Sequence, residues 1–105
     1  MKFTEEVKTK WLEALESGKY VHGTGQLAKI ENGITKHCCL GVFCELYPEE
    51  LPHNGMDIII DGKNLHYGPI MNLIGDVDTL TWTNDFSKDG YNPVIPLIKE
   101  LKTVE

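Results

Sequence analysis

Apolar and polar residues follow one another along the chain in blocks whose spacing predicts the secondary structure. The most apolar block covers residues 38–47, where apolar side chains recur at positions 39, 42, 43 and 46. Steps of three and four residues place side chains on one face of a helix, so we expect a buried central helix, entered from a strand that ends near His37. Gly41 lies inside this pattern at a cost of about 1 kcal/mol relative to alanine, which indicates that another segment approaches the backbone there.

Two amphipathic helices are predicted near the ends of the chain. Thr4 is a suitable N-cap for the first helix, and residues 17–18 (Ser-Gly) close it. Trp11 lies on the apolar stripe of this helix, which favours a place in the core over a role as a platform for a ligand. The last helix is expected to begin with Asn92 as N-cap and Pro93 as its first residue. Its apolar stripe consists of Val94, Leu97, Ile98 and Leu101.

Turn residues predict two short antiparallel hairpins. Asn32-Gly33 and Asp61-Gly62 are pairs that favour positive φ at both central positions of a two-residue turn. We therefore expect a strand, a turn and a second strand between residues 20 and 37, and another hairpin between residues 56 and 67.

The region before the last helix has weaker signals. Residues 70–74 are expected to form a short helical turn, and residues 80–86, in which apolar and polar side chains alternate, to lie in a loop. The elements together predict a compact single α+β domain covering residues 1–105, with three main helices, two short antiparallel hairpins and the central helix at about 38–47.

Net charge, the length of apolar stretches and the number of cysteines each limit the partners and the compartment expected for this chain. The net charge is −6, and all ten basic residues are lysines. Long nucleic acid is not expected as a partner, because binding it requires a basic surface that neutralises phosphates. No apolar stretch reaches the ~18 residues of a membrane span, so no membrane contact is expected. Three cysteines, two of them adjacent, form no disulfide framework and favour a reducing cytoplasm.

A thiol and imidazole cluster precedes the central helix, but its spacing favours packing over chemistry. Structural zinc uses two ligand pairs whose members are two to four residues apart, and adjacent cysteines such as Cys38 and Cys39 rarely bind one ion. A thiol beside His37 near a helix N-terminus could have a lowered pKa, yet no third residue is placed to orient such a pair. We therefore expect buried core thiols, no functional metal, no cofactor and no enzymatic activity.

Two stretches carry groups suited to binding a nucleotide. Residues 82–85 (Trp-Thr-Asn-Asp) combine an aromatic plane, a hydroxyl, an amide and a carboxylate, which could stack on a base and read its edge. In the alternative interpretation, Trp82 fills the core and residues 84–85 shape a turn. Residues 22–26 contain two glycines whose backbone N–H groups could face an anion, although a plain flexible loop fits equally. The candidate ligand-binding residues are Tyr20, His22, Thr24, Gly25, Gln26, Trp82, Asn84 and Asp85.

Four blocks of the sequence carry a resemblance to a known family. These are Trp11-x-x-Ala14-Leu15-x-Ser17-Gly18-x-Tyr20, then Gly25-x-Leu27, then Cys38-Cys39-Leu40-Gly41-Val42-x-Cys44, and finally Asn84-Asp85. Together they resemble a widespread family of small phage-encoded proteins, and among these the viral sponge proteins that counter CBASS immunity by sequestering cyclic nucleotide signals. The chain departs from the family pattern at His22, where glutamine is common, and at Thr83, where leucine commonly precedes Asn-Asp. Either change could alter the choice of ligand.

The resemblance implies a phage counter-defence protein of the host cytoplasm that binds a cyclic nucleotide without turnover. A chain of this size has little room to enclose a dinucleotide, so we expect a homo-oligomer whose copies share the pocket. The alternatives are a small acidic inhibitor that docks on a host protein and, with no convincing set of catalytic residues, an enzyme that degrades the signal.

Overall fold

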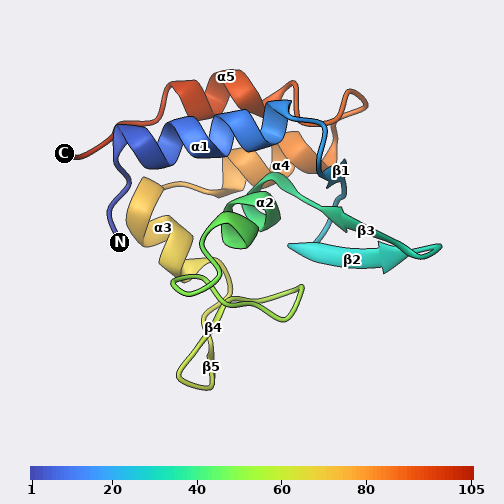
Figure 1. The fold of residues 1–105 in the computed structure, drawn as a ribbon, viewed down its shortest axis with the longest axis horizontal. Coiled ribbons are helices and arrows are strands. Elements are labelled where there is room, and N and C mark those ends of the chain that lie inside the picture. Colours follow the sequence, from blue (N-terminus) through green and yellow to red (C-terminus); the bar gives the residue numbers. More distant parts are fainter.

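Five helices and five short strands follow one another along residues 1–105, all of which the computed structural model describes (Figure 1). The helices are α1 (Glu5–Glu16), α2 (Cys39–Leu46), α3 (Gly68–Ile74), α4 (Asp78–Asp85) and α5 (Val94–Lys99). The strands are β1 (Val21–His22), β2 (Ala28–Glu31), β3 (Ile34–His37), β4 (Ile59–Ile60) and β5 (Lys63–Asn64). The fold is a single domain of mixed helices and strands, in agreement with the α+β class expected from the sequence.

The apolar block at the middle of the sequence forms the central helix α2, as predicted. Strand β3 ends at His37, and every residue from Cys39 to Cys44 is buried. The Cys38 thiol occupies the N-cap position and accepts a hydrogen bond from the Gly41 N–H at 3.4 Å. Trp11 has no exposed surface, and its indole N–H donates to the Cys39 carbonyl at 2.9 Å. Trp11 is therefore a core residue that also fixes the first turn of α2.

Another segment approaches the backbone of α2 at Gly41, as predicted from the glycine inside the apolar helical pattern. A β-carbon placed on Gly41 would lie 1.8 Å from the carbonyl oxygen of Leu27, in the loop before β2. Leu27 is itself fully buried, and its carbonyl accepts the Cys38 N–H at 3.3 Å. The missing side chain lets the loop after β1 pack directly on the backbone of the central helix.

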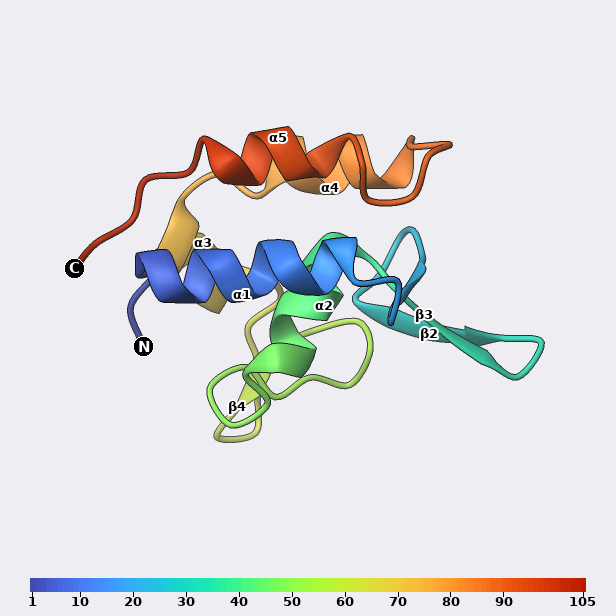
Figure 2. The ribbon, with the colours of Figure 1, turned by 45° about the horizontal axis from the view of Figure 1, so that its top comes forward.

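Helix α1 packs against α2 and α5, and α4 packs against the same two helices (Figures 1 and 2). Thr4 caps α1 as predicted, because its hydroxyl accepts the Val7 N–H at 3.2 Å. The rings of Trp11 and Phe43 pack with centroids 4.6 Å apart and join α1 to α2. On the opposite side, the buried Lys8 ammonium donates to the Leu101 carbonyl at 2.9 Å. A cation at the carbonyl end of α5 is stabilised by the helix dipole.

Both predicted hairpins are present. Asn32 and Gly33 have φ values of 51° and 77°, as a two-residue turn between β2 and β3 requires, and Figure 2 shows this hairpin extending away from the helices. Asp61 and Gly62 make the equivalent turn between β4 and β5, at φ values of 52° and 76°. An additional strand, β1, pairs in parallel with β3 and gives the sheet the order β1-β3-β2.

The structure has five helices where three main helices were expected. The difference of most consequence is α4, because residues 80–86 were assigned to a loop. In α4, Leu80 and Asn84 are buried, whereas Trp82 and Phe86 are exposed. Both pairs have the four-residue spacing of a helix, but two large aromatic residues on the exposed face give the sequence an alternation that resembles a strand.

The start of the last helix also differs from its predicted form. Pro93 takes the cap position of α5, and no side chain caps this end. The Asn92 amide instead donates to the Asp89 carboxylate at 3.0 Å, so Asn92 stabilises the preceding loop. The first N–H groups of α5 are satisfied by the Tyr91 carbonyl, which accepts from Val94 and Ile95. The expectation that Asn92 caps the helix was therefore wrong.

We predict that Gly41→Ala unfolds the protein or removes several kcal/mol of stability, since the added methyl group would overlap the Leu27 carbonyl in a segment held by buried contacts. Gly68→Ala in α3 is the matched control, because its β-carbon would meet open space and its backbone φ is not positive. Thermal melting compares the two variants with the wild type. A Gly41→Ala protein that melts at the wild-type temperature would contradict the close approach of the loop to α2.

Candidate binding site

The two segments selected from the sequence as a binding site contact each other in the structure. The His22 Nε2 atom lies 2.9 Å from the Asn84 carbonyl, to which it donates. The Gly25 N–H donates to the Asp85 carboxylate at 3.1 Å. The loop after β1 therefore rests against the C-terminal end of α4, although its residues lie about sixty positions earlier in the sequence.

The buried side chain of Asn84 holds together the junction between the loop after β1 and the C-terminal end of α4. Its side chain has no exposed surface, and its Oδ1 accepts the N–H of Cys39 at 3.1 Å. Its Nδ2 group donates to the Gly23 carbonyl and to the Asp85 carboxylate, both at 3.0 Å. A buried amide with both donor hydrogens and its oxygen in use has no free edge to present to a base. The interpretation of Asn84 as a base reader is therefore replaced by a structural one.

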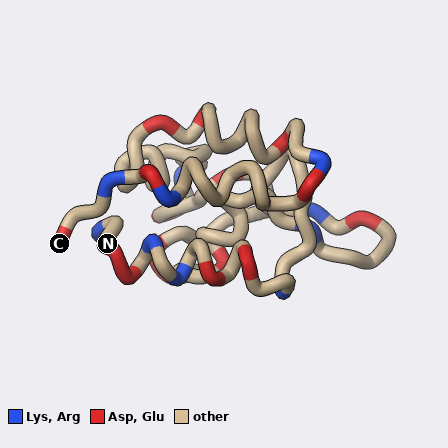
Figure 3. Tube along the Cα trace, turned by 90° about the horizontal axis from the view of Figure 1, so that it is seen from above, with Lys and Arg blue, Asp and Glu red and all other residues tan.

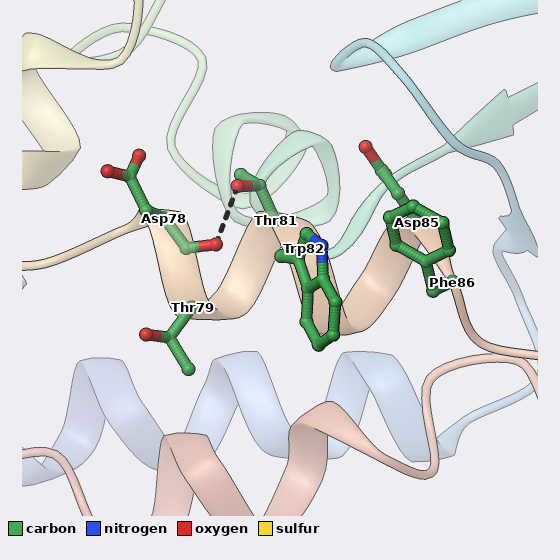
Figure 4. A pocket seen from close by; sticks show the side chains of 6 residues that line it. All are labelled: Asp78, Thr79, Thr81, Trp82, Asp85 and Phe86. Atoms are coloured by element: carbon green, nitrogen blue, oxygen red, sulfur yellow. Dashed lines mark hydrogen bonds between the residues drawn. The ribbon is translucent and has the colours of Figure 1, made fainter.

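An open depression of about 470 Å³ lies on the outer face of α4 (Figure 4). Two large aromatic side chains line it, Trp82 and Phe86, which are 67% and 71% exposed. Their ring centroids are 5.2 Å apart and their planes are tilted by 45°. The alternative in which Trp82 fills the core is therefore excluded. The other lining residues are Asp78, Thr79, Thr81 and Asp85.

A second depression, of about 520 Å³, lies at the other side of the β1 loop. Two candidate residues, Tyr20 and His22, line it together with the end of α1 and residues 89–92. His22 packs edge-on against Tyr91, with ring centroids 5.2 Å apart. Because Nε2 of His22 is bonded to a carbonyl, the proton of the neutral ring is fixed there, and Nδ1 has no hydrogen-bond partner within the chain.

Each depression is lined by two carboxylates and by no lysine. The one on α4 has Asp78 and Asp85, and the second has Glu16 and Asp89. Figure 3 shows that acidic and basic positions are spread along the whole chain. The two depressions differ in their neighbours, because Lys19 and Lys88 stand next to lining residues of the second depression in the sequence, whereas no basic residue stands next to a lining residue of the first. The second depression is therefore the better candidate for an anion.

Besides the buried Asn84, three candidate residues line neither depression. The Gln26 amide folds back to donate to the Ala28 carbonyl at 2.7 Å, and Thr24 is half-buried in the same loop. Gly25 adopts a φ of 82° that allows its N–H to reach Asp85. These residues shape the loop between the two depressions.

Phe86 and Tyr91 line the depressions but were not selected from the sequence. Phe86 follows Trp82 by four residues, a spacing that reveals a shared face once residues 78–85 are known to be helical. Tyr91 donates from its hydroxyl to the His37 carbonyl at 2.6 Å, and burial raises the pKa of this phenol. No short-range pattern in the sequence connects Tyr91 to a strand that lies 54 positions earlier.

The three thiols are inaccessible. All three cysteines are free and buried, and burial raises the pKa of Cys38 to about 11 and that of Cys44 to about 12. Burial likewise raises the pKa of Cys39 well above its ordinary value. Thiols in this state are not ionised at neutral pH and are poor nucleophiles. No group of three or more His, Cys, Asp or Glu side chains is arranged to hold a metal ion.

We predict that Asn84→Ala lowers the free energy of unfolding by about 2–4 kcal/mol, because the buried Cys39 N–H loses its partner along with the other bonds of the amide. Such a loss corresponds to a decrease of roughly 10 °C or more in melting temperature for a domain of this size. Thr83→Ala, one position earlier on α4, is the control and is expected to melt close to the wild type. If both variants melt together with the wild type, the amide does not hold the junction.

Comparison with known proteins places the chain in a family without an assigned function. No curated protein and no solved structure matches it, and none of its five helices combines the length and apolar character needed to cross a membrane. One family model matches residues 2–89, which include every element described above except α5. The chain therefore belongs to the family described as a domain of unknown function, DUF8296.

Proposed function

We propose that this protein binds and sequesters a cyclic nucleotide without turnover, as a phage counter-defence protein in the host cytoplasm. The observation that carries the proposal is the presence of two half-buried rings, those of Tyr20 and His22, at the depression of about 520 Å³, where the buried Tyr91 ring packs against His22. Aromatic faces stack on bases of any identity, and pockets of this size accept small ligands. Tyr20 and His22 are also two of the residues that the sequence pointed to independently.

Donors for the phosphates come from the lining of the same depression and from residues next to it in the sequence. The Tyr20 hydroxyl has no hydrogen-bond partner within the chain, and Lys19 and Lys88 each precede a lining residue. Because the chain has no arginine, these groups and backbone N–H groups are its means of holding an anion. Because all three thiols are buried, the proposal assigns no role to them.

The proposal includes a homo-oligomer. Sequestration at nanomolar concentrations requires about −12 kcal/mol of binding free energy. Stacking contributes about 1–3 kcal/mol per base, so an open depression on one copy is insufficient. A second copy placed over the depression would supply the missing wall and a second set of rings, and light scattering would then give a multiple of 11.9 kDa.

We predict that Tyr20→Ala weakens binding of cyclic dinucleotides by ~1–3 kcal/mol, the contribution of one stacked base. Trp82→Ala is the matched control, because it also removes an aromatic side chain but from the depression on α4. Calorimetry measures affinity, and melting curves show whether either variant loses its fold. Recovery of intact ligand after the loaded protein is denatured distinguishes sequestration from degradation. Equal loss of affinity in both variants, or none in either, would contradict this site.

A second function is supported by a different observation, the exposed pair Trp82 and Phe86 beside two carboxylates. Large aromatic residues at the centre of an acidic surface are typical of a protein–protein contact, where tryptophan is often the residue that contributes most to affinity. This arrangement favours an inhibitor that docks on a host protein through α4.

A further inference from the structure

We propose that the depression on α4 binds an arginine side chain presented by a partner protein. This inference rests on the second function above, docking through α4, and it specifies the chemical group that α4 recognises. It is independent of the nucleotide site, which lies in the other depression.

The first argument is that the hydroxyl and carboxylate groups lining this depression can only accept hydrogen bonds from a ligand, which leaves the Trp82 indole N–H as the one free side-chain donor. The hydroxyl of Thr79 donates to the Asp76 carboxylate at 3.0 Å, and that of Thr81 donates to the Asp78 carbonyl at 3.0 Å. Both hydroxyl protons are therefore in use, which leaves oxygen lone pairs for a ligand. The side-chain carboxylate of Asp78 receives no hydrogen bond from the chain, and one oxygen of Asp85 is likewise unused.

The second argument is that this acceptor set adjoins exposed aromatic surface. Trp82 and Phe86 present their rings at the same depression; Trp82 lies between Asp78 and Asp85, and Phe86 lies next to Asp85 at the C-terminal end of α4 (Figure 4). The carbonyl end of α4, at Asp85, adds partial negative charge beside them. The ligand that fits best is therefore cationic, rich in donors and able to stack on a ring.

Guanidinium meets all of these requirements. It is planar, carries five N–H donors and no acceptor, pairs with carboxylates and stacks on aromatic faces. A lysine ammonium supplies charge but cannot stack, and it is more strongly hydrated. A phosphate in this depression would face two carboxylates with no basic residue next to any lining residue in the sequence.

Charge also identifies where the arginine comes from. A second copy of this chain is not the source, since the sequence contains no arginine and a two-fold contact through α4 would place acidic residues opposite acidic residues. The occupant is therefore a different protein with a basic surface, complementary to a chain whose net charge is −6.

The test uses N-acetyl-arginine amide as the probe and the folded full chain. The indole N–H signals of Trp11 and Trp82 are assigned by nuclear magnetic resonance with a Trp82→Phe variant, and the buried Trp11 is an internal reference. We expect arginine amide to shift the Trp82 signal at a concentration about tenfold lower than lysine amide requires. The isosteric neutral citrulline amide is expected to leave the signal unchanged.

Matched variants separate recognition from general electrostatics. Asp78→Asn is expected to weaken the arginine-dependent shift several-fold, whereas Glu13→Gln, which removes the same charge from an exposed position on α1, leaves it unchanged. Equal effects of the two variants, equal affinity for arginine and lysine, or no shift at any concentration would overturn the proposal.

A separate measurement distinguishes failure of this inference from failure of the docking function. Wild-type protein and Trp82→Ala are used to capture proteins from host lysate, untreated or treated with the arginine-selective reagent butanedione. Capture that requires both Trp82 and unmodified arginine supports the proposal. Capture that requires Trp82 but survives butanedione overturns arginine recognition while docking stands, and capture that is independent of Trp82 overturns both.

Discussion

The side-chain amide of Asn84 is the interaction on which the arrangement of the chain depends. It joins three segments that are distant in the sequence: α4, the first residue of α2 at Cys39, and the loop at Gly23. Each bond is buried, so none can be replaced by water if the amide is removed. The amide therefore holds backbone segments that are distant in the sequence in one relative geometry.

Both depressions owe their shape to this junction. Since α4 is held from its buried side, Trp82 and Phe86 face outward, and the same contact presses His22 against the end of α4, where its ring forms part of the other depression. The domain therefore offers two separate depressions that share one structural support.

How far the sequence predicts the structure depends on whether the signal is local. The central helix, both hairpin turns and the close approach at Gly41 follow from spacing and from residues with special backbone preferences, and all are present. Helix α4 was missed because Trp82 and Phe86 are apolar residues on an exposed face, which inverts the pattern that reveals a helix. The parallel pairing of β1 with β3 has no local signal, since the two strands are joined through residues whose spacing indicates a loop.

The candidate site follows the same rule. The sequence identified the two segments that contact each other in the structure. It assigned Asn84 to ligand binding, because composition does not reveal which face of an element is buried. The sequence did not reveal that the candidate residues belong to two different depressions. It also omitted Tyr91, whose position is set by a hydrogen bond to His37 rather than by any motif.

The central claim, that the Asn84 amide holds the junction, is tested most directly by hydrogen exchange of the Cys39 amide. This N–H lies at the start of α2, where the intrahelical bond is missing, so the Asn84 oxygen is its partner. If that bond persists, the Cys39 amide exchanges as slowly as the slowest amides of α2, through global unfolding. Exchange of the Cys39 amide as fast as that of exposed loop amides, while the rest of α2 stays protected, would contradict the account.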